Sequence, residues 1–350
     1  MAFQGIADLF ASDIYTGGFT MFSMKKAFRT AGAVALTFLM LTPAALAAKT
    51  FQLSDNQPPD YPTTLGDKEF SRLVKERTNG AIVIDVYDSA QLFDEKSAIE
   101  SAQMGGLAFC RVNAQPLSDF APSLGVLSLP YIFRDEAHLW NVLNGPVGEE
   151  ILGELEKSGL IGLTYYDSGS RSFYNNKRVV KTPADMKGLK IRVQQSKLMM
   201  GMVNSLGASA TPMAYGEVFT GLQSGVIDGA ENNWPSYYST AHYEVAPFFT
   251  LDHHTRTPEV LCMSKITWDS LSKEEQKIVK QAAVESQKVQ RDAWKAYEAK
   301  SIKAITGGGK VTVTEVEDLG AWQKAVQPVY SQVDLGSRKD EFIKKIAAVK

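Results

Sequence analysis

The chain has 350 residues, of which 44% are hydrophobic and 22% charged, values typical of a globular protein long enough for two domains. Its 37 basic and 39 acidic side chains give a net charge of −2, so it offers no broad cationic surface for nucleic acid. Gly and Pro are scattered without a period, which argues against collagen and repeat arrays. We therefore expect a small-molecule partner and no nucleic-acid partner.

Residues 1–47 have the pattern of an upstream extension followed by a signal peptide. A basic segment at residues 24–29 precedes an apolar run at 31–41, which is too short to span a bilayer. Pro43 interrupts the run, and Ala45-Leu46-Ala47 matches the small-x-small motif before a cleavage site. The sequence predicts cleavage after Ala47 and a mature protein in the periplasm, with extracellular release as the alternative.

Only two cysteines, Cys110 and Cys262, enter the oxidising compartment, and each lies in an apolar run. A disulfide between them is one interpretation. A mature chain of about 300 residues can bury a sufficient core without one. We therefore expect two reduced, buried cysteines.

Hydrophobic patterning predicts alternating strands and helices along the mature chain. The first strands are expected at residues 50–54, 82–87 and 107–112, with helices at 64–78 and 95–103 between them. This βαβαβ order predicts parallel pairing in a sheet covered by helices. A second series is expected as strands at 160–166 and 189–193 and helices at 196–206 and 217–224, and a strand at 259–264 is expected to pass between the two series. Two α/β lobes with a cleft between them follow, and a packed two-domain enzyme without hinge motion is the alternative.

A long amphipathic helix is expected from Ser272 to about Thr306. Ser272 and Glu275 have the spacing of a capping box, and an apolar stripe follows them. Such a helix would be about 45 Å long, enough to brace both lobes. The glycine run 307–309 is expected to end it and to lead into a strand at 311–314.

Motifs for catalysis, cofactors and metals are missing from the sequence. No GxSxG or GxGxxG occurs, and the glycine run before Lys310 lacks the spacing of a phosphate-binding loop. The four histidines form no HExxH motif, and adjacent His253 and His254 would point to opposite sides of an extended segment. We predict no catalytic residue, no metal site and no cofactor.

Several polar side chains are suited to holding a ligand. Strand alternation places Lys190 and Arg192 on one face, and the planar guanidinium of Arg192 matches a carboxylate. Arg171 is expected in a Gly-Ser loop beyond a strand at 163–166. For both arginines a surface salt bridge is the alternative. Residues 228–235 combine amides, acids and an indole in a turn-rich stretch that either binds hydroxyls or only forms an Asx turn.

The order of motifs along nearly the whole mature chain, about 50 to 335, resembles the DctP-type substrate-binding proteins of tripartite ATP-independent periplasmic (TRAP) transporters. The motifs are Ser54-Asp55-Asn56-Gln57-Pro58, Tyr61-Pro62-Thr63, Ile99-Glu100, Phe109-Cys110-Arg111-Val112-Asn113, Leu129-Pro130-Tyr131-Ile132-Phe133-Arg134, Tyr165-Tyr166-Asp167-Ser168-Gly169, Lys190-Ile191-Arg192-Val193-Gln194, Thr211-Pro212-Met213 and residues 226–233. The segments 232–237, 242–245 and 251–254 are most similar to the branch that binds hexuronates and related sugar acids.

The resemblance implies an α/β, two-lobed periplasmic binding protein (Venus flytrap) fold with mixed sheets and a long helix bracing both lobes. It places lobe I at 48–169 plus about 258–297 and lobe II at 170–257 plus about 298–350. The implied ligand-binding residues are Arg192 as the carboxylate clamp, Arg171, Asn232 and Asn233 beside it, Glu95, Arg111, Asn56 and Gln57 on the other lobe, and His254 and Glu259. Trp234, Tyr174 and Tyr215 are candidates to cover a sugar face, with core packing favoured for Tyr215.

The function implied by the resemblance is a non-enzymatic, monomeric solute-binding protein that captures a carboxylated sugar and delivers it to TRAP membrane permease subunits. The alternative is an exported hydrolase or lyase acting on sugar acids, with Glu95, Glu231 or Asp228 as general acid and base. The choice among glucuronate, galacturonate, another sugar acid and a dicarboxylate stays open at this point.

Overall fold

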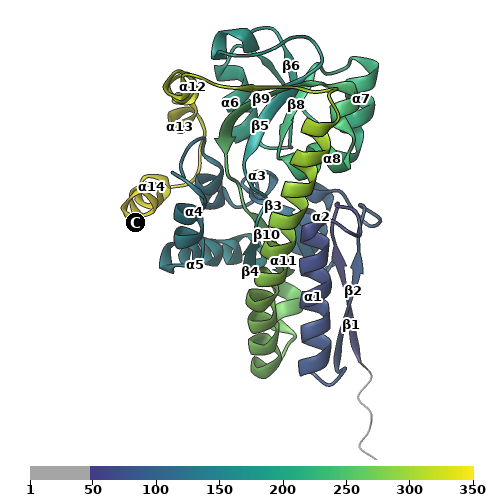
Figure 1. Cartoon of the computed structure of the whole chain (residues 1–350). Coiled ribbons are helices and arrows are strands. Elements are labelled where there is room, and N and C mark those ends of the chain that lie inside the picture. The colour runs from purple at the N-terminus through teal and green to yellow at the C-terminus, as the bar shows by residue number, and fades with distance from the viewer. Residues whose placement is uncertain (1–47) are drawn as a thin grey trace, which may run out of the picture. The chain divides into compact units, whose positions relative to one another are not determined.

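The computed structural model describes residues 48–350, which form one compact unit with two β-sheets (Figure 1). The predicted extension and signal peptide, residues 1–47, lie outside the described residues. Within residues 48–350, no helix combines the length and the apolar character that a bilayer crossing requires.

The first sheet has five strands in the order β2-β1-β3-β10-β4. Their bounds are Ile82–Tyr87 for β2, Lys49–Ser54 for β1, Phe109–Asn113 for β3, Glu259–Ser264 for β10 and Leu160–Tyr166 for β4. β1 pairs in parallel with both β2 and β3, as the βαβαβ order predicts. β10 runs antiparallel between β3 and β4, so a strand from late in the chain completes this sheet.

The second sheet has six strands in the order β11-β9-β5-β8-β6-β7. Their bounds are Thr312–Glu315 for β11, Phe248–Thr255 for β9, Arg171–Asn175 for β5, Gly229–Asn232 for β8, Lys190–Val193 for β6 and Ser209–Pro212 for β7. β5 is antiparallel to both of its neighbours, β8 and β9, whereas β6 is parallel to β7 and β8. Both sheets are therefore mixed.

Helices surround the two sheets. The longer ones are α1 (Pro62–Arg77), α2 (Glu95–Gln103), α4 (Glu136–Leu143), α5 (Pro146–Gly153), α6 (Lys197–Ser205), α7 (Val218–Ser224), α11 (Lys273–Gly307), α12 (Leu319–Val326) and α14 (Lys339–Ala348). The short ones are α3 (Ala114–Leu117), α8 (Trp234–Ser239), α9 (His242–Val245), α10 (Lys265–Asp269) and α13 (Val329–Gln332). Residues 48–350 also contain four 3₁₀ helices, at Pro122–Ser128 (η1), Glu154–Ser158 (η2), Pro183–Met186 (η3) and Tyr215–Glu217 (η4).

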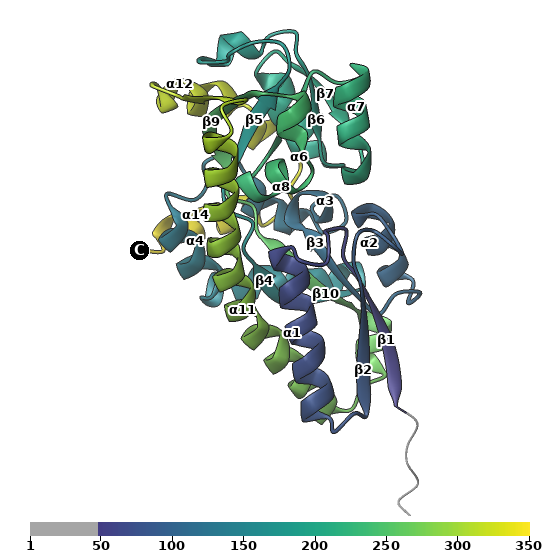
Figure 2. The same cartoon turned by 45° about the vertical axis from the view of Figure 1, so that its right-hand side comes forward.

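The long helix α11 packs on elements of both sheets. Its N-terminus has the predicted capping box, because Ser272 Oγ accepts from the Glu275 amide and Glu275 Oε2 accepts from the Ser272 amide. α11 lies against α1 and β4 beside the first sheet and against α8 beside the second (Figures 1 and 2). Residues 167–170 connect β4 to β5, and residues 256–258 connect β9 to β10. The lobe boundaries drawn from the sequence stay a prediction.

Two local predictions at residues that bear on the site are wrong. Arg171 begins strand β5 and does not lie in a loop. The stretch 228–235 is not a turn region, because it contains strand β8 and the start of helix α8. All residues of β5 and β8 are buried, so neither strand shows the polar and apolar alternation by which a half-buried strand is recognised.

The expected state of the cysteines is confirmed. Cys110 and Cys262 are both buried and free, and they occupy opposite positions on the paired strands β3 and β10.

Candidate functional site

Side chains from both sheets and their helices converge on a small internal cavity of about 10 Å³, room for about one water molecule. Its lining residues are Asn56, Gln57, Tyr61, Glu95, Arg111, Arg171, Gln194, Tyr215, Asn232, Asn233, Ser236 and Glu259. Two larger hollows, beside Trp140 and Arg291 and beside Lys197 and Leu335, open more widely to solvent. The internal cavity is the candidate site because it gathers buried charges and amides from segments far apart in the sequence.

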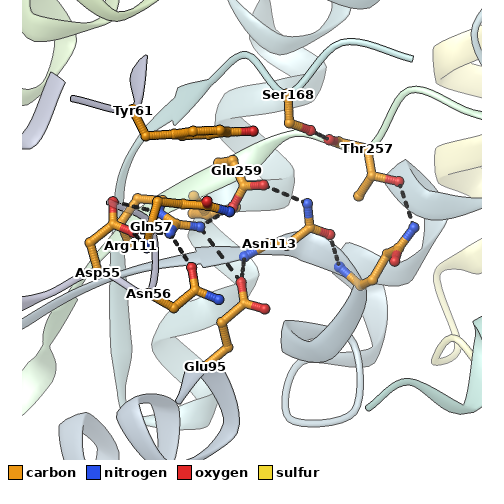
Figure 3. A network of polar contacts seen from close by, with 12 residues as sticks. Asp55, Asn56, Gln57, Tyr61, Glu95, Arg111, Asn113, Ser168, Thr257 and Glu259 are labelled. Carbon is orange, nitrogen blue, oxygen red and sulfur yellow. Dashed lines mark hydrogen bonds and ion pairs between the residues drawn. The ribbon is translucent and has the colours of Figure 1, made fainter. Parts of the chain in front are cut away.

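Arg111, on β3, is the centre of a buried polar network beside this cavity (Figure 3). Its guanidinium forms hydrogen bonds with both carboxylate oxygens of Asp55 and donates to Glu259 Oε2 at 2.6 Å. It also donates to Asn56 Oδ1 and lies 3.6 Å from Glu95 Oε1. Burial alone would raise the pKa of Asp55, but the charge and hydrogen bonds of Arg111 hold that pKa below its usual value. Carboxylates of the protein therefore already neutralise Arg111.

Arg171, at the start of β5, is neutralised in a similar way. Its Nε and one terminal nitrogen donate to the two carboxylate oxygens of Glu231 on the neighbouring strand β8, at 2.5 and 2.8 Å. The other terminal nitrogen donates to Asn232 Oδ1 at 2.9 Å. This bidentate pair is buried at both partners, so it holds the Arg171 guanidinium in one orientation at the cavity wall.

His254, on β9, extends the Arg171–Glu231 pair into a chain of buried charges. Its Nε2 lies 3.3 Å from Glu231 Oε2, and its Nδ1 lies 2.9 Å from Asp252 Oδ2. Burial would lower the pKa of His254, but the two carboxylates raise it to about 9. Burial would likewise raise the pKa of Glu231, but Arg171 and His254 lower it to about 2. His254 is therefore protonated at neutral pH and helps to position Glu231.

These charges predict a loss of stability at alkaline pH. The pKa of His254 is about 9 in the folded protein and near 6.5 in the unfolded chain, so its contribution is complete below pH 6.5 and is lost as pH rises through 9. Between about pH 6 and pH 10, the stability difference between wild type and His254→Gln should shrink by about 3 kcal/mol in urea unfolding. His253→Gln is the matched control: His253 is exposed and its pKa is lowered, so wild type should gain slightly in stability relative to this variant as pH rises through 6.5 and should show no loss near pH 9. A constant difference for His254→Gln would contradict the assignment.

Arg192, on β6, differs from the other two arginines in having no carboxylate partner among residues 48–350. Its side chain is buried, and both Nε and one terminal nitrogen donate to the carbonyl oxygen of Met213, at 3.0 and 2.7 Å. Burial lowers the pKa of Arg192, whereas the carboxylates beside Arg111 and Arg171 outweigh burial there. A buried cation without a counterion is costly, so this position favours an added anion.

Two hydrogen bonds close the cavity by joining elements of the two sheets. The hydroxyls of Tyr61, before α1, and Ser236, on α8, share a hydrogen bond of 2.8 Å. Gln194 Nε2, just after β6, donates to Glu95 Oε2 at the start of α2, at 3.0 Å. The cavity is therefore enclosed in a closed arrangement of the two walls.

Eight of the side chains implied by the resemblance line this cavity. They are Asn56, Gln57, Glu95, Arg111, Arg171, Asn232, Asn233 and Glu259. Three others do not line it in this arrangement: Arg192 reaches Met213, His254 lies behind Glu231, and Trp234 packs edge-on against Phe249.

Three lining residues are absent from the set drawn from the sequence, namely Tyr61, Gln194 and Ser236, and a fourth, Tyr215, was named there only as a candidate to cover a sugar face. Core packing was favoured for Tyr215, and the structure corrects this, because its side chain faces the cavity. Gln194 was identifiable in principle, since it follows Arg192 by two positions and so shares its face of the strand. No sequence pattern marks Tyr61 and Ser236 as site residues, because only the fold brings their hydroxyls together.

Comparisons with known proteins agree with this architecture. The family described as bacterial extracellular solute-binding protein, family 7 (DctP), matches residues 53–334. A solute-binding protein of Chromohalobacter salexigens is 41% identical over 275 residues, which cover 79% of this chain and 82% of that protein.

Two crystal structures of TRAP periplasmic solute-binding proteins are similar over the same region. One, from Xanthobacter autotrophicus Py2 with bound β-D-galacturonate, is 44% identical with a TM-score of 0.83 and covers 86% of this chain and 100% of its own. The other, from Chromohalobacter salexigens with bound D-glucuronate, is 38% identical with a TM-score of 0.82 at the same coverage. The expected α/β fold of a periplasmic binding protein is confirmed. The chain therefore belongs to the DctP family, the solute-binding proteins of TRAP transporters.

Proposed function

We propose that this protein captures a hexuronate, such as galacturonate or glucuronate, in the cavity between its two sheets. The observation that carries the proposal is the unpaired charge of Arg192, since Arg111 and Arg171 are already matched by carboxylates of the protein. A ligand carboxylate would supply the missing counterion. The relatives from Xanthobacter and Chromohalobacter with bound galacturonate and glucuronate support a sugar acid as that ligand.

Closure around the ligand would explain how a narrow cavity admits a sugar. In an open form Arg192 would meet the ligand in water, and approach of the two walls would then desolvate the ion pair and make it more selective. The two connections at 167–170 and 256–258 are where we place the hinge, with lobe I at 48–169 plus about 258–297 and lobe II at 170–257 plus about 298–350. Release requires that closure be reversible.

We propose that the protein delivers its ligand without catalysing a reaction on it. The protein, cleaved after Ala47 and monomeric in the periplasm, would hand the sugar acid to TRAP permease subunits in the membrane. The carboxylates that line the cavity support this, because both are already engaged: Glu95 accepts from two donors, and Glu259 contacts Arg111 and Asn113. Glu231, behind the cavity wall, holds Arg171. None is free to act as a general base in the closed arrangement.

Calorimetric titration of the purified protein with galacturonate and glucuronate tests this function. We expect saturable binding of one ligand per protein, with the sugar recovered unchanged by chromatography after prolonged incubation. In a thermal unfolding assay, a ligand at 100 times its Kd should stabilise the protein by about 2.7 kcal/mol. Absence of saturable binding across a panel of uronates would refute the proposal, and consumption of the sugar would favour the hydrolase or lyase alternative.

A further inference from the structure

Gln194 lies between Arg192, the proposed carboxylate clamp, and Glu95 on the opposite wall of the cavity. It follows β6 directly and lies two residues beyond Arg192, so both side chains lie on the same face of the extended chain. Two residues along a strand span about 6.6 Å, a distance comparable with the width of one sugar ring. The Gln194 side chain is 7% exposed and lines the cavity.

Glu95 determines which way the Gln194 amide points. Gln194 Nε2 donates to Glu95 Oε2 at 3.0 Å, while Glu95 Oε1 accepts from the Asn113 amide at 2.8 Å. Burial and the neighbouring charge of Glu259 raise the pKa of Glu95, and Arg111 together with the Asn113 amide opposes part of that rise. Because a carboxylate only accepts hydrogen bonds, the amide NH₂ of Gln194 must face Glu95 and its carbonyl oxygen must point away.

The carbonyl oxygen of Gln194 has no partner. Oε1 is buried and accepts no hydrogen bond from any residue in 48–350. Buried acceptors are normally satisfied, and one left without a donor carries the cost of its lost hydration. This oxygen therefore needs a hydrogen-bond donor that the rest of residues 48–350 does not provide.

The chemistry of that donor follows from the neighbouring charges. A ligand hydroxyl can donate to Gln194 Oε1, whereas a second carboxylate placed there would meet an acceptor and the negative charge of Glu95. We propose that Gln194, oriented by Glu95, is a specificity-determining residue that selects a hydroxylated monocarboxylate over a dicarboxylate. The inference rests on the proposed function, because it takes the ligand carboxylate to be bound at Arg192.

Gln194→Met tests the inference with galacturonate and succinate as the two probes, each titrated calorimetrically. Methionine keeps the length of the side chain and removes its hydrogen bonds. We expect galacturonate affinity to fall about 5- to 150-fold and succinate affinity to fall much less. The ratio of galacturonate affinity to succinate affinity should therefore decrease. Gln195→Met is the matched control: Gln195 is half-buried, does not line the cavity, and its replacement should leave both affinities unchanged. An equal loss for both acids, or no loss for galacturonate, would overturn the inference.

Glu95→Gln supplies a second test that does not depend on how Gln194→Met folds. An amide at position 95 can donate to Gln194 Oε1, which lets the Gln194 amide turn its NH₂ towards the cavity. Galacturonate affinity should then fall while succinate affinity rises, whereas an unchanged ratio of the two would count against the orienting role. If wild-type protein binds no uronate, the proposed function itself fails. If wild type binds uronate but both variants keep its preference, only the role of Gln194 fails.

Discussion

Replacement of Arg192 by methionine should abolish most uronate binding while leaving the unliganded protein at least as stable as wild type. Loss of one partner of a buried charge pair costs about 2 to 5 kcal/mol, which corresponds to a roughly 30- to 4000-fold rise in Kd. The unliganded protein gains from the same change, because Arg192 is buried without a carboxylate partner among residues 48–350. Calorimetric titration and thermal unfolding measure the two effects separately.

This opposite response distinguishes a ligand clamp from a structural arginine. Lys190→Met is the matched control on the same strand: Lys190 is exposed, so its loss should change neither Kd nor Tm appreciably. If Arg192→Met lowered Tm strongly and left Kd unchanged, Arg192 would be a structural residue that holds the Met213 carbonyl, and the proposed clamp would be wrong.

Replacement of Glu231 by glutamine should have the opposite pattern, with a large loss of stability before any ligand is added. Glu231, on β8, lies between Arg171 on β5 and His254 on β9. Its removal leaves these two buried cations without their shared anion. Breaking a buried ion pair in this way costs about 3 to 5 kcal/mol. That is a large part of the usual stability of a folded domain, about 5 to 15 kcal/mol. Urea unfolding of wild type and variant at neutral pH measures the loss.

A surface pair of the same chemistry provides the control for Glu231. Glu285 pairs in bidentate fashion with Arg77, but its side chain is 55% exposed. Glu285→Gln should therefore cost less than about 1 kcal/mol. Similar losses in the free energy of unfolding for the two variants would mean that burial does not determine how much the Arg171–Glu231–His254 chain contributes to stability.

Features encoded within a few residues were predicted well from the sequence. The capping box of Ser272 and Glu275 begins α11 at the expected place, because both of its hydrogen bonds form between residues three apart. Strand β10, Glu259–Ser264, also has the predicted bounds, since its run of buried residues is continuous. The fold class and family followed from the order of such local motifs along the chain.

Features that depend on distant partners were missed. Strand β9 contains Asp252 and His254, polar residues that are buried only because Glu231, on β8, completes their charge chain. Arg171 was placed in a loop because the strands that pair with β5 come some 60 to 80 residues later. Periodicity within one segment carries no information about such partners.

The sequence by itself determined which residues were available for binding an acid: the arginines, the amides and the acidic side chains of the expected site. Only the tertiary structure decided which of the three arginines keeps an unmatched charge, because Arg111 and Arg171 find their carboxylates on other strands and Arg192 finds none among residues 48–350. It also decided that Gln194 donates a hydrogen bond to Glu95, a residue 99 positions earlier in the chain. Electrostatic pairing depends on distance in space, and distance in space is set by how the two sheets pack together.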